Sequence, residues 1–224
     1  MVLARESLAG QTALHLAAES GNSGAVRALL MLTPDRQALT CTADRFGRYT
    51  ALHLAAERGR AVAARTLLEL TEDREALLMM EERFAGQMAL HLAALAGHDE
   101  VVQALLEFAP DPAALLLRRD RAGGFQALHL AAEQGHSHAV QVILELAPNR
   151  GELLTAPLKR WSGLTPLHLA AYRGHEDAAA VLLRFAPDRK ALMSTLDSRG
   201  RTPADIAAAR GHRDMTALAD GAAS

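Results

Sequence analysis

Aromatic residues are scarce in this sequence, because five Phe, two Tyr and one Trp make up 4% of its 224 residues. Its core must therefore be built from Ala, Leu and Val, which favours helices that pack closely together. The longest apolar runs, such as 113–117, are far too short to span a bilayer, and the first ten residues hold no hydrophobic segment of signal-peptide length. A single cysteine, Cys41, excludes an internal disulfide and a multi-cysteine zinc site. We therefore expect a soluble, cytoplasmic protein.

The charge balance is close to neutral, with a formal net charge of −2 and an isoelectric point near 6.6. Such a balance disfavours general binding to nucleic acid or to an anionic membrane. The cations are nevertheless unusual, because only Lys159 and Lys190 are lysines while 22 are arginines. A GC-rich coding sequence would produce this bias, and so would selection for planar cations that stack and form paired hydrogen bonds. Composition does not separate these two explanations.

An 11-residue segment recurs six times along the chain in near-constant phase. Successive copies begin 38, 38, 38, 39 and 37 residues apart. A period of this length indicates a solenoid in which each repeat stacks on its neighbours. The copies are TALHLAAESGN at 12, TALHLAAERGR at 50, MALHLAALAGH at 88, QALHLAAEQGH at 126, TPLHLAAYRGH at 165 and TPADIAAARGH at 202.

Each copy has the pattern of a helical hairpin. Thr begins four of the six copies at the position of a helix N-cap, and Pro166 and Pro203 follow where a missing N–H costs nothing. The first helix ends at a Gly, the residue that best tolerates the left-handed terminating conformation. A second helix carries apolar pairs one turn apart, such as Val101/Val102 and Leu105/Leu106. Neither helix buries its apolar face alone, so the hairpins must stack.

These features closely resemble the ankyrin repeat family. The resemblance covers residues 7 to 220 and rests on the T-P-L-H-x-A type segment, the glycine-closed first helix and the apolar second helix. It implies an all-α, curved solenoid with projecting β-hairpin or loop fingers, forming a single domain over residues 1–224. It also implies a non-catalytic protein that grips partners with its fingers and inner, first helices. The expected repeats are 7–44, 45–82, 83–120, 121–159, 160–196 and 197–220, of which the last is polar and is expected to be a C-terminal cap.

The repeats depart from the family pattern in two ways. They are about five residues longer than the usual length of about 33 residues. The excess follows the second helix, where Pro34, Pro110, Pro148 and Pro187 precede apolar pairs, and it predicts an added short helix or an extended connector. In addition, Met88 and Gln126 replace the capping Thr in the two central repeats. This replacement is either drift or the mark of a centre shaped for contact.

The histidine-rich stretch at 127–138 looks at first like a metal site. Its His129 is the repeat histidine and its His136 belongs to the Gly-His pair that ends several first helices, so only His138 is additional. The resemblance makes the repeat histidines structural, with rings that bond backbone groups near neighbouring fingers. No phosphate-binding loop, complete zinc-protease motif or nucleophile elbow is present in the sequence. We therefore expect no metal, no cofactor and no enzymatic activity.

The fingers concentrate arginine and aromatic residues. Aligned back from each first helix, they begin with Arg in the four inner repeats and with Asp197 in the last, whereas ankyrin fingers commonly carry Asp there to stabilise the turn. Protein-binding hot spots are enriched in Trp, Tyr and Arg. Alternatively, these aromatics pack on one another and the arginines pair with neighbouring acidic residues. The predicted finger contacts are Arg45, Phe46, Tyr49, Arg83, Phe84, Arg121, Phe125, Arg160 and Trp161.

Exposed pairs at the ends of the inner helices complete the predicted binding face. Their charges are mixed, and an apolar saddle at Leu95 lies near the middle. Such a surface suits a partner polypeptide in the concave face better than a nucleic acid, because acidic residues would face phosphates. Two alternatives stay open: a nucleic-acid binder that stacks bases on Arg and aromatic residues, and the targeting domain of a larger enzyme or effector. We expect a monomer whose inner-helix contacts are Glu57, Arg58, Leu95, Glu133, Gln134, Tyr172 and Arg173.

Overall fold

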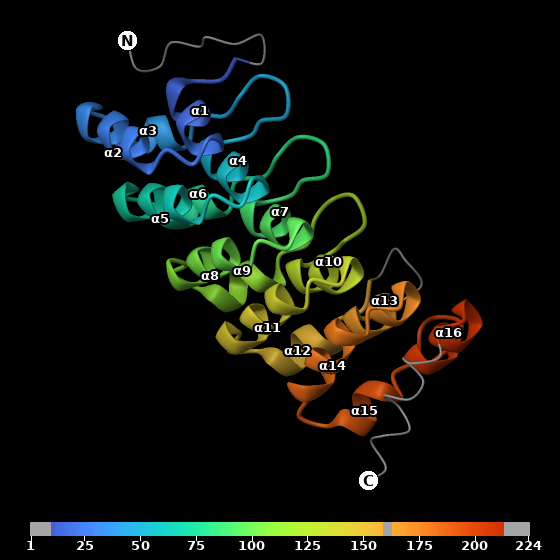
Figure 1. Cartoon of the computed structure of the whole chain (residues 1–224). Helices are drawn as coiled ribbons and strands as arrows, with labels where there is room; N and C mark the ends of the chain where they lie inside the picture. Colours follow the sequence, from blue (N-terminus) through green and yellow to red (C-terminus); the bar gives the residue numbers. More distant parts are fainter. Residues whose placement is uncertain (1–9, 159–162, 213–224) are drawn as a thin grey trace.

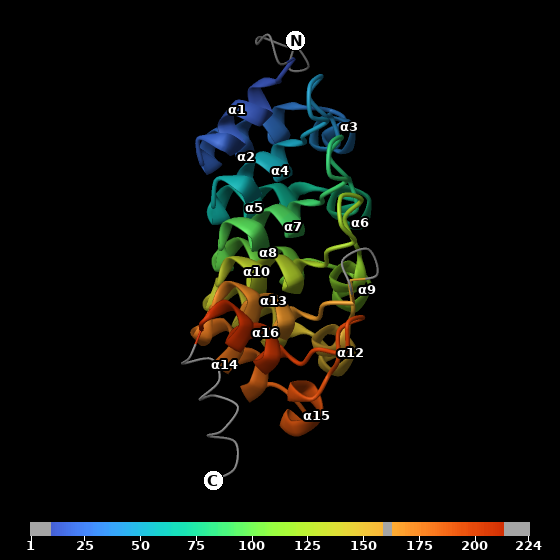
Figure 2. The same ribbon diagram turned by 90° about the vertical axis from the view of Figure 1, so that its right-hand side faces the viewer.

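The computed structural model describes residues 10–158 and 163–212 of the chain. In these residues the helices form three parallel columns along one long axis (Figure 1; Figure 2). The inner column contains α1 (Ala13–Glu19), α4 (Ala51–Glu57), α7 (Ala89–Ala96), α10 (Ala127–Gln134), α13 (Pro166–Arg173) and α16 (Pro203–Arg210). The outer column contains α2 (Ser23–Leu32), α5 (Ala61–Leu70), α8 (Asp99–Glu107), α11 (Ser137–Leu146) and α14 (Glu176–Arg184).

The third column confirms that the extra residues of each repeat form a short helix. It contains α3 (Arg36–Thr40), α6 (Arg74–Leu78), α9 (Pro112–Leu117), α12 (Arg150–Thr155) and α15 (Arg189–Met193). An acidic residue begins most of these helices; Asp35 Oδ1, for example, accepts a hydrogen bond from the N–H of Ala38 at 2.8 Å. Leu77 and Leu78 at the end of α6 are both buried in the hydrophobic core, so this helix packs against the inner and outer columns.

The core is a continuous layer of Leu, Ala and Val between the inner and outer columns. The inner helices turn leucines inward at equivalent positions, and Leu14, Leu52 and Leu128 are fully buried. Burial of each such side chain stabilises the fold by about 1.5–3 kcal/mol. Since no single repeat closes this layer, each unit depends on its neighbours.

The fingers are the loops that precede the inner helices, and Figure 1 shows them projecting along one edge of the stack. Of the two forms expected for the fingers, the described ones are loops: they contain bends and turns and, between Leu158 and Leu164, one isolated antiparallel bridge. Met88 and Gln126 are each 1% exposed. They therefore belong to the interior and not to a contact surface.

Candidate partner-binding site

The second, third, fourth and sixth fingers are each held by an acidic side chain at their start. Asp44 Oδ1 accepts hydrogen bonds from the N–H groups of Gly47 and Tyr49, both at 3.0 Å. Asp120 holds its finger through Gly123 and Phe125 in the same way. A carboxylate that accepts backbone N–H bonds fixes a tight turn without any help from the fingertip.

This geometry corrects the alignment of the fingers. Asp197 accepts from the N–H groups of Arg199 and Arg201, so it is equivalent to Asp44 and not to Arg45. Glu82 plays the same part in the third finger, with only 2% of its surface exposed. Arg45, Arg83 and Arg121 therefore follow the turn-forming carboxylate and do not replace it.

Backbone hydrogen bonds join neighbouring fingers. The N–H of Arg83 donates to the carbonyl oxygen of Gly47 at 2.7 Å, and the N–H of Arg121 donates to that of Ala85 at the same distance. The two bonds lie at equivalent positions of successive fingers. Fingers two to four thus form a strip of fixed spacing.

Repeat histidines link several inner helices to the following finger or to the connector before it. Nδ1 of His15 accepts from the N–H of Thr12 at 3.1 Å, while Nε2 lies 2.9 Å from the carbonyl oxygen of Tyr49. The proton must therefore sit on Nε2, because a carbonyl oxygen only accepts. Burial lowers the pKa of His129 to about 3 and that of His53 to about 4. These rings are neutral structural links.

The predicted fingertip residues divide into exposed and inward-facing groups. Phe46 is 62% exposed and Phe84 is 74% exposed, with Arg45 and Arg83 exposed beside them. Tyr49 instead faces inward: it is half-buried and meets His53 edge-on at 5.8 Å between ring centroids. Burial raises the pKa of the Tyr49 phenol. Its exposure as a fingertip contact is therefore small.

The fourth and fifth fingers hold the other predicted contacts. Arg121 is exposed and forms an ion pair with Glu81, an acidic neighbour on the preceding finger. Phe125 is half-buried and meets His129 edge-on, with ring centroids 6.4 Å apart. Arg160 and Trp161 lie outside the described residues.

Ion pairs join successive inner helices at two places on the binding face. Arg58 pairs with Glu19 at 3.1 Å, and Arg173 pairs with Glu133 at 2.6 Å. The other predicted inner-helix residues keep to the same surface: Glu57 and Leu95 are half-buried and Gln134 is exposed. We call this surface, formed by the inner helices and the fingers, the inner face.

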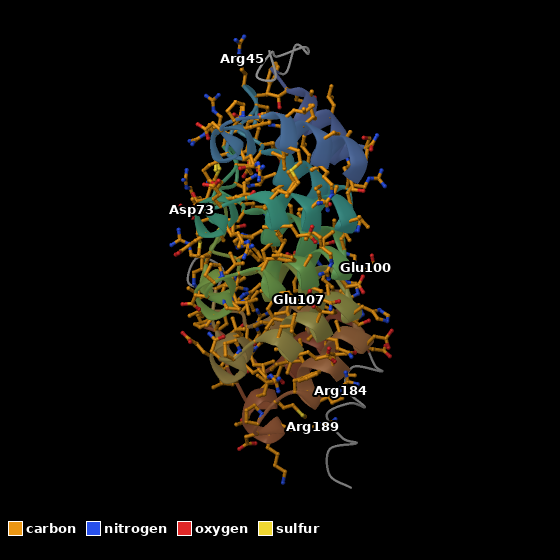
Figure 3. All side chains as sticks on the ribbon, turned by 90° about the vertical axis from the view of Figure 1, so that its left-hand side faces the viewer. Arg45, Asp73, Glu100, Glu107, Arg184 and Arg189 are labelled. Carbon is orange, nitrogen blue, oxygen red and sulfur yellow. The ribbon has the colours of Figure 1, made fainter. Side chains whose placement is uncertain are left out.

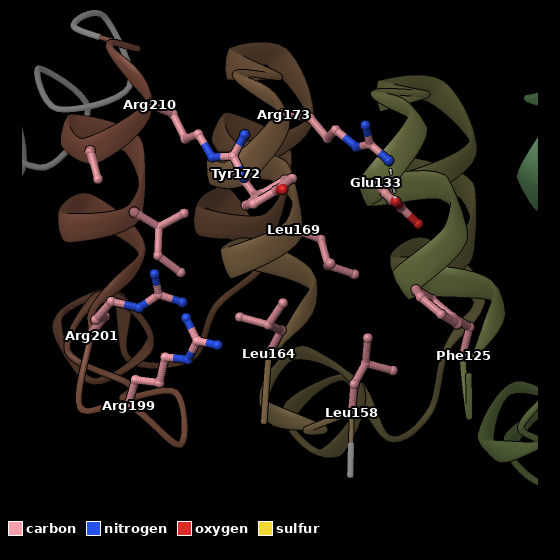
Figure 4. A pocket seen from close by; sticks show the side chains of 12 residues that line it. Phe125, Glu133, Leu158, Leu164, Leu169, Tyr172, Arg173, Arg199, Arg201 and Arg210 are labelled. Carbon is pink, nitrogen blue, oxygen red and sulfur yellow. Dashed lines mark hydrogen bonds and ion pairs between the residues drawn. The ribbon is translucent and has the colours of Figure 1, made fainter. Parts of the chain in front are cut away.

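The most developed hollow of the inner face lies between α10, α13 and α16 (Figure 4). It measures about 560 Å³ and brings together four of the predicted contacts, Phe125, Glu133, Tyr172 and Arg173. We call it the terminal pocket. The residues around it that the sequence did not single out are Leu158, Leu164, Leu169, Arg199, Arg201, Ile206, Ala209 and Arg210.

Tyr172 connects the two sides of the terminal pocket. The guanidinium carbon of Arg210 lies 3.7 Å from the centroid of the Tyr172 ring, and that of Arg173 lies 5.8 Å away. Such cation–π contacts contribute about 0.5–1 kcal/mol each at exposed sites. The signal that pointed here was the aromatic at the end of α13, whereas Arg210 belongs to a final repeat that its polar composition made look like a cap.

Side chains across the rest of the described surface show a different arrangement. Figure 3 shows charged groups spread over the outer and third columns, and there Arg65 pairs with Glu107 at 2.7 Å. Among the described residues no three His, Cys, Asp or Glu side chains are grouped as a metal ion would require. None of the helices in these residues is long and apolar enough to cross a membrane.

Comparison with known proteins agrees with the helical columns and the histidine links. The family model for ankyrin repeats (3 copies) matches residues 3–76, 73–151 and 146–222. No curated protein sequence matches the chain. The three matched ranges together span nearly all of the sequence, so this chain belongs to the ankyrin repeat family.

Proposed function

We propose that this protein is a non-catalytic binding module that holds a partner polypeptide against its inner face. Ankyrin repeats are generally protein–protein interaction modules, which supports the proposal. We further propose that residues 1–224 act as one domain, that the protein works as a monomer and that it acts in the cytoplasm, where a lone cysteine such as Cys41 stays reduced.

The observation that carries this proposal is the pair of exposed rings on adjacent fingers. Phe46 and Phe84 are mostly exposed although aromatic residues are scarce in the chain. The fold does not require either ring, because backbone bonds and Asp44 or Glu82 already hold these fingers. Burial of one such ring against a partner would contribute about 1.5–3 kcal/mol to binding. Exposed arginines beside the rings add the composition of a binding hot spot.

Charge distribution favours a polypeptide over a nucleic acid as the partner. Glu19 and Glu133 lie on the inner face and engage Arg58 and Arg173, so two of its cations are already paired. A phosphate backbone would meet these carboxylates and would have to displace the pairs. A polypeptide with side chains of both signs and some apolar groups matches the same surface.

The test is affinity capture from an extract of the source cells with the full chain as bait, followed by titration of each purified partner. Phe84→Ser should weaken the captured complex at least tenfold, because it removes the most exposed ring of the fingers. Val62→Ser is the matched control, since Val62 is 64% exposed on α5 of the outer column. Thermal melts should show both variants folded like the wild type.

Two outcomes would contradict the proposal. One is the absence of any saturable partner. The other is a set of partners that bind Phe84→Ser and Val62→Ser equally well. Steep weakening of binding by added salt would instead favour the nucleic-acid alternative, since phosphate contacts release counterions.

A further inference from the structure

The terminal pocket has an apolar floor and a cationic rim. Its aliphatic lining comes from one finger, through Leu158 and Leu164, and from two inner helices, through Leu169 and Ile206; Leu164 is the most accessible of the four. Figure 4 shows Leu158, Leu164 and Leu169 near α13, with Arg199, Arg201 and Arg210 on the side of α16. Four guanidinium groups line the pocket against one carboxylate, that of Glu133. This excess of positive charge contrasts with the net charge of −2 of the whole chain.

The four arginines differ in what holds them. Arg173 is paired with Glu133, and Arg201 forms two hydrogen bonds to Asp197 Oδ2, at 2.9 and 2.7 Å. In the described part of the chain, no acidic side chain lies within salt-bridge distance of Arg199 or Arg210. Among the described residues, these two cations have no compensating carboxylate, and both line a pocket with an apolar floor.

The side chains of Arg199 and Arg210 lie along the rim of the terminal pocket. Arg199 and Arg201 extend side by side from the last described finger toward Leu164, while Arg210 lies across Tyr172 at the other edge (Figure 4). Tyr172 holds Arg210 in place, so this side chain loses little entropy when an anion binds. A guanidinium presents paired N–H donors that match the two oxygens of a carboxylate.

We infer that the terminal pocket binds an acidic peptide segment, whose carboxylates engage Arg199 and Arg210 while an adjacent aliphatic or aromatic side chain covers the leucine floor. The inference rests on the proposed function and specifies the chemistry of the partner. A volume of about 560 Å³ falls in the usual range for a ligand pocket. An apolar floor gives no solvation to a sugar–phosphate chain, whereas it can cover an apolar side chain next to a carboxylate.

The experiment selects short random peptides, displayed on phage, for binding to the full chain, and then titrates synthetic copies by fluorescence anisotropy. We expect the selected sequences to place Asp or Glu next to Leu, Ile, Met or Phe. Arg199→Glu and Arg210→Gln, which alter different elements, should each weaken binding at least about tenfold, because truncation of a charge partner is costly. Lys190→Glu is the matched control, since Lys190 lies on α15 and does not line the pocket.

Further arms separate the sources of the carboxylate. Peptides with a free and with an amidated C-terminus distinguish a terminal carboxylate from a side-chain one. Replacement of the selected Glu by Gln should weaken binding as much as Arg199→Glu does. Melting curves of both arginine variants should match the wild type, so that any loss of binding reflects the pocket and not the fold.

Each contrary result would overturn the inference. Selected peptides without acidic residues, an equal response of Arg199→Glu and Lys190→Glu, or selection of no peptide at all would exclude an acidic-peptide pocket. Binding of a short single-stranded oligonucleotide that is lost in both arginine variants, with no competition by acidic peptides, would assign the pocket to nucleic acid. The proposed function is judged separately, because capture that depends on Phe84 would survive the first three of these results.

Discussion

The imidazole of His136 packs against Gly97, the residue that ends α7 of the preceding repeat. A methyl group on residue 97 would lie 2.5 Å from Nδ1 of that ring, and residue 97 has a φ of 75°. Nε2 of the same ring lies 3.1 Å from the carbonyl oxygen of Leu95. The recurring Gly-His dipeptide therefore serves contacts between repeats. The histidine of one repeat fills the space that the glycine of the previous repeat leaves open.

Replacement of this glycine should test both parts of the contact. Gly97→Ala should lower the free energy of unfolding by about 2 kcal/mol or more, since a left-handed conformation alone costs about 1–2 kcal/mol. Adding His136→Ala should recover only the steric part. Gly151→Ala in α12, where no atom lies within 4 Å, should leave stability unchanged or slightly raised. Urea unfolding of the variants measures this; equal effects at both glycines would contradict it.

Acid should destabilise the fold through its buried histidines. Burial lowers the pKa values of His53 and His129 below the ordinary value of 6.5, to about 4 and about 3. Their contribution is complete above pH 6.5 and is lost as the pH falls toward the folded value, because the unfolded chain binds the protons first. Each histidine then removes about 1.4 kcal/mol per pH unit.

The measurement is the urea midpoint between pH 7.5 and pH 5. His129→Gln should reduce the slope of stability against pH, whereas the same change at the exposed His138 should leave it unaltered. A wild-type stability that rises on acidification, or equal slopes in the two variants, would show that the repeat histidines are not neutral links.

The turn-forming carboxylates should contribute more to the free energy of unfolding than any fingertip side chain does. Asp120→Ala leaves the N–H groups of Gly123 and Phe125 without their acceptor, and we expect a loss of about 2–3 kcal/mol. Asp120→Asn keeps an oxygen acceptor and should cost less than half as much. Arg83→Ala, on an exposed side chain, should change stability by less than about 0.5 kcal/mol. Chemical denaturation of the three variants ranks them, and a different order would refute the assigned role.

One finger carries a strained residue. The position two before the N-cap of each inner helix has a positive φ, and in the described residues it is Gly everywhere except at Arg48, where φ is 58°. Arg48→Gly should therefore raise the free energy of unfolding by about 0.5–1 kcal/mol. Arg83→Gly, at a position without positive φ, should lower it by a similar amount through chain entropy. Thermal melts compare the pair; a destabilising Arg48→Gly would mean that its side chain supports the finger.

Periodicity predicted the helices and the structural role of the histidines because every copy of the segment meets the same neighbours. It failed at the fingers, since Asp44 lies six residues before its helix cap whereas Asp197 lies five residues before its own. Alignment from the helix therefore shifted the aspartate by one position.

The terminal pocket escaped sequence reasoning for a related reason. Its lining comes from three successive inner helices and from fingers on either side, so no single copy of the repeat contains it. Arg210 is identified as a candidate contact by its distance to Tyr172, and both Arg199 and Arg210 by the absence of an acidic neighbour among the described residues. Such relations depend on side-chain directions across repeats, which a linear pattern does not encode.

The backbone hydrogen bonds between fingers also affect which ligands fit the inner face. Because the N–H of Arg83 holds Gly47 and that of Arg121 holds Ala85, the tips cannot slide independently along the axis. An extended ligand that lies across them meets contact points at graduated, invariant intervals. Selectivity then depends on the chemistry of the ligand's contact groups and also on the distance between those groups, which must equal the fixed spacing of the fingertips.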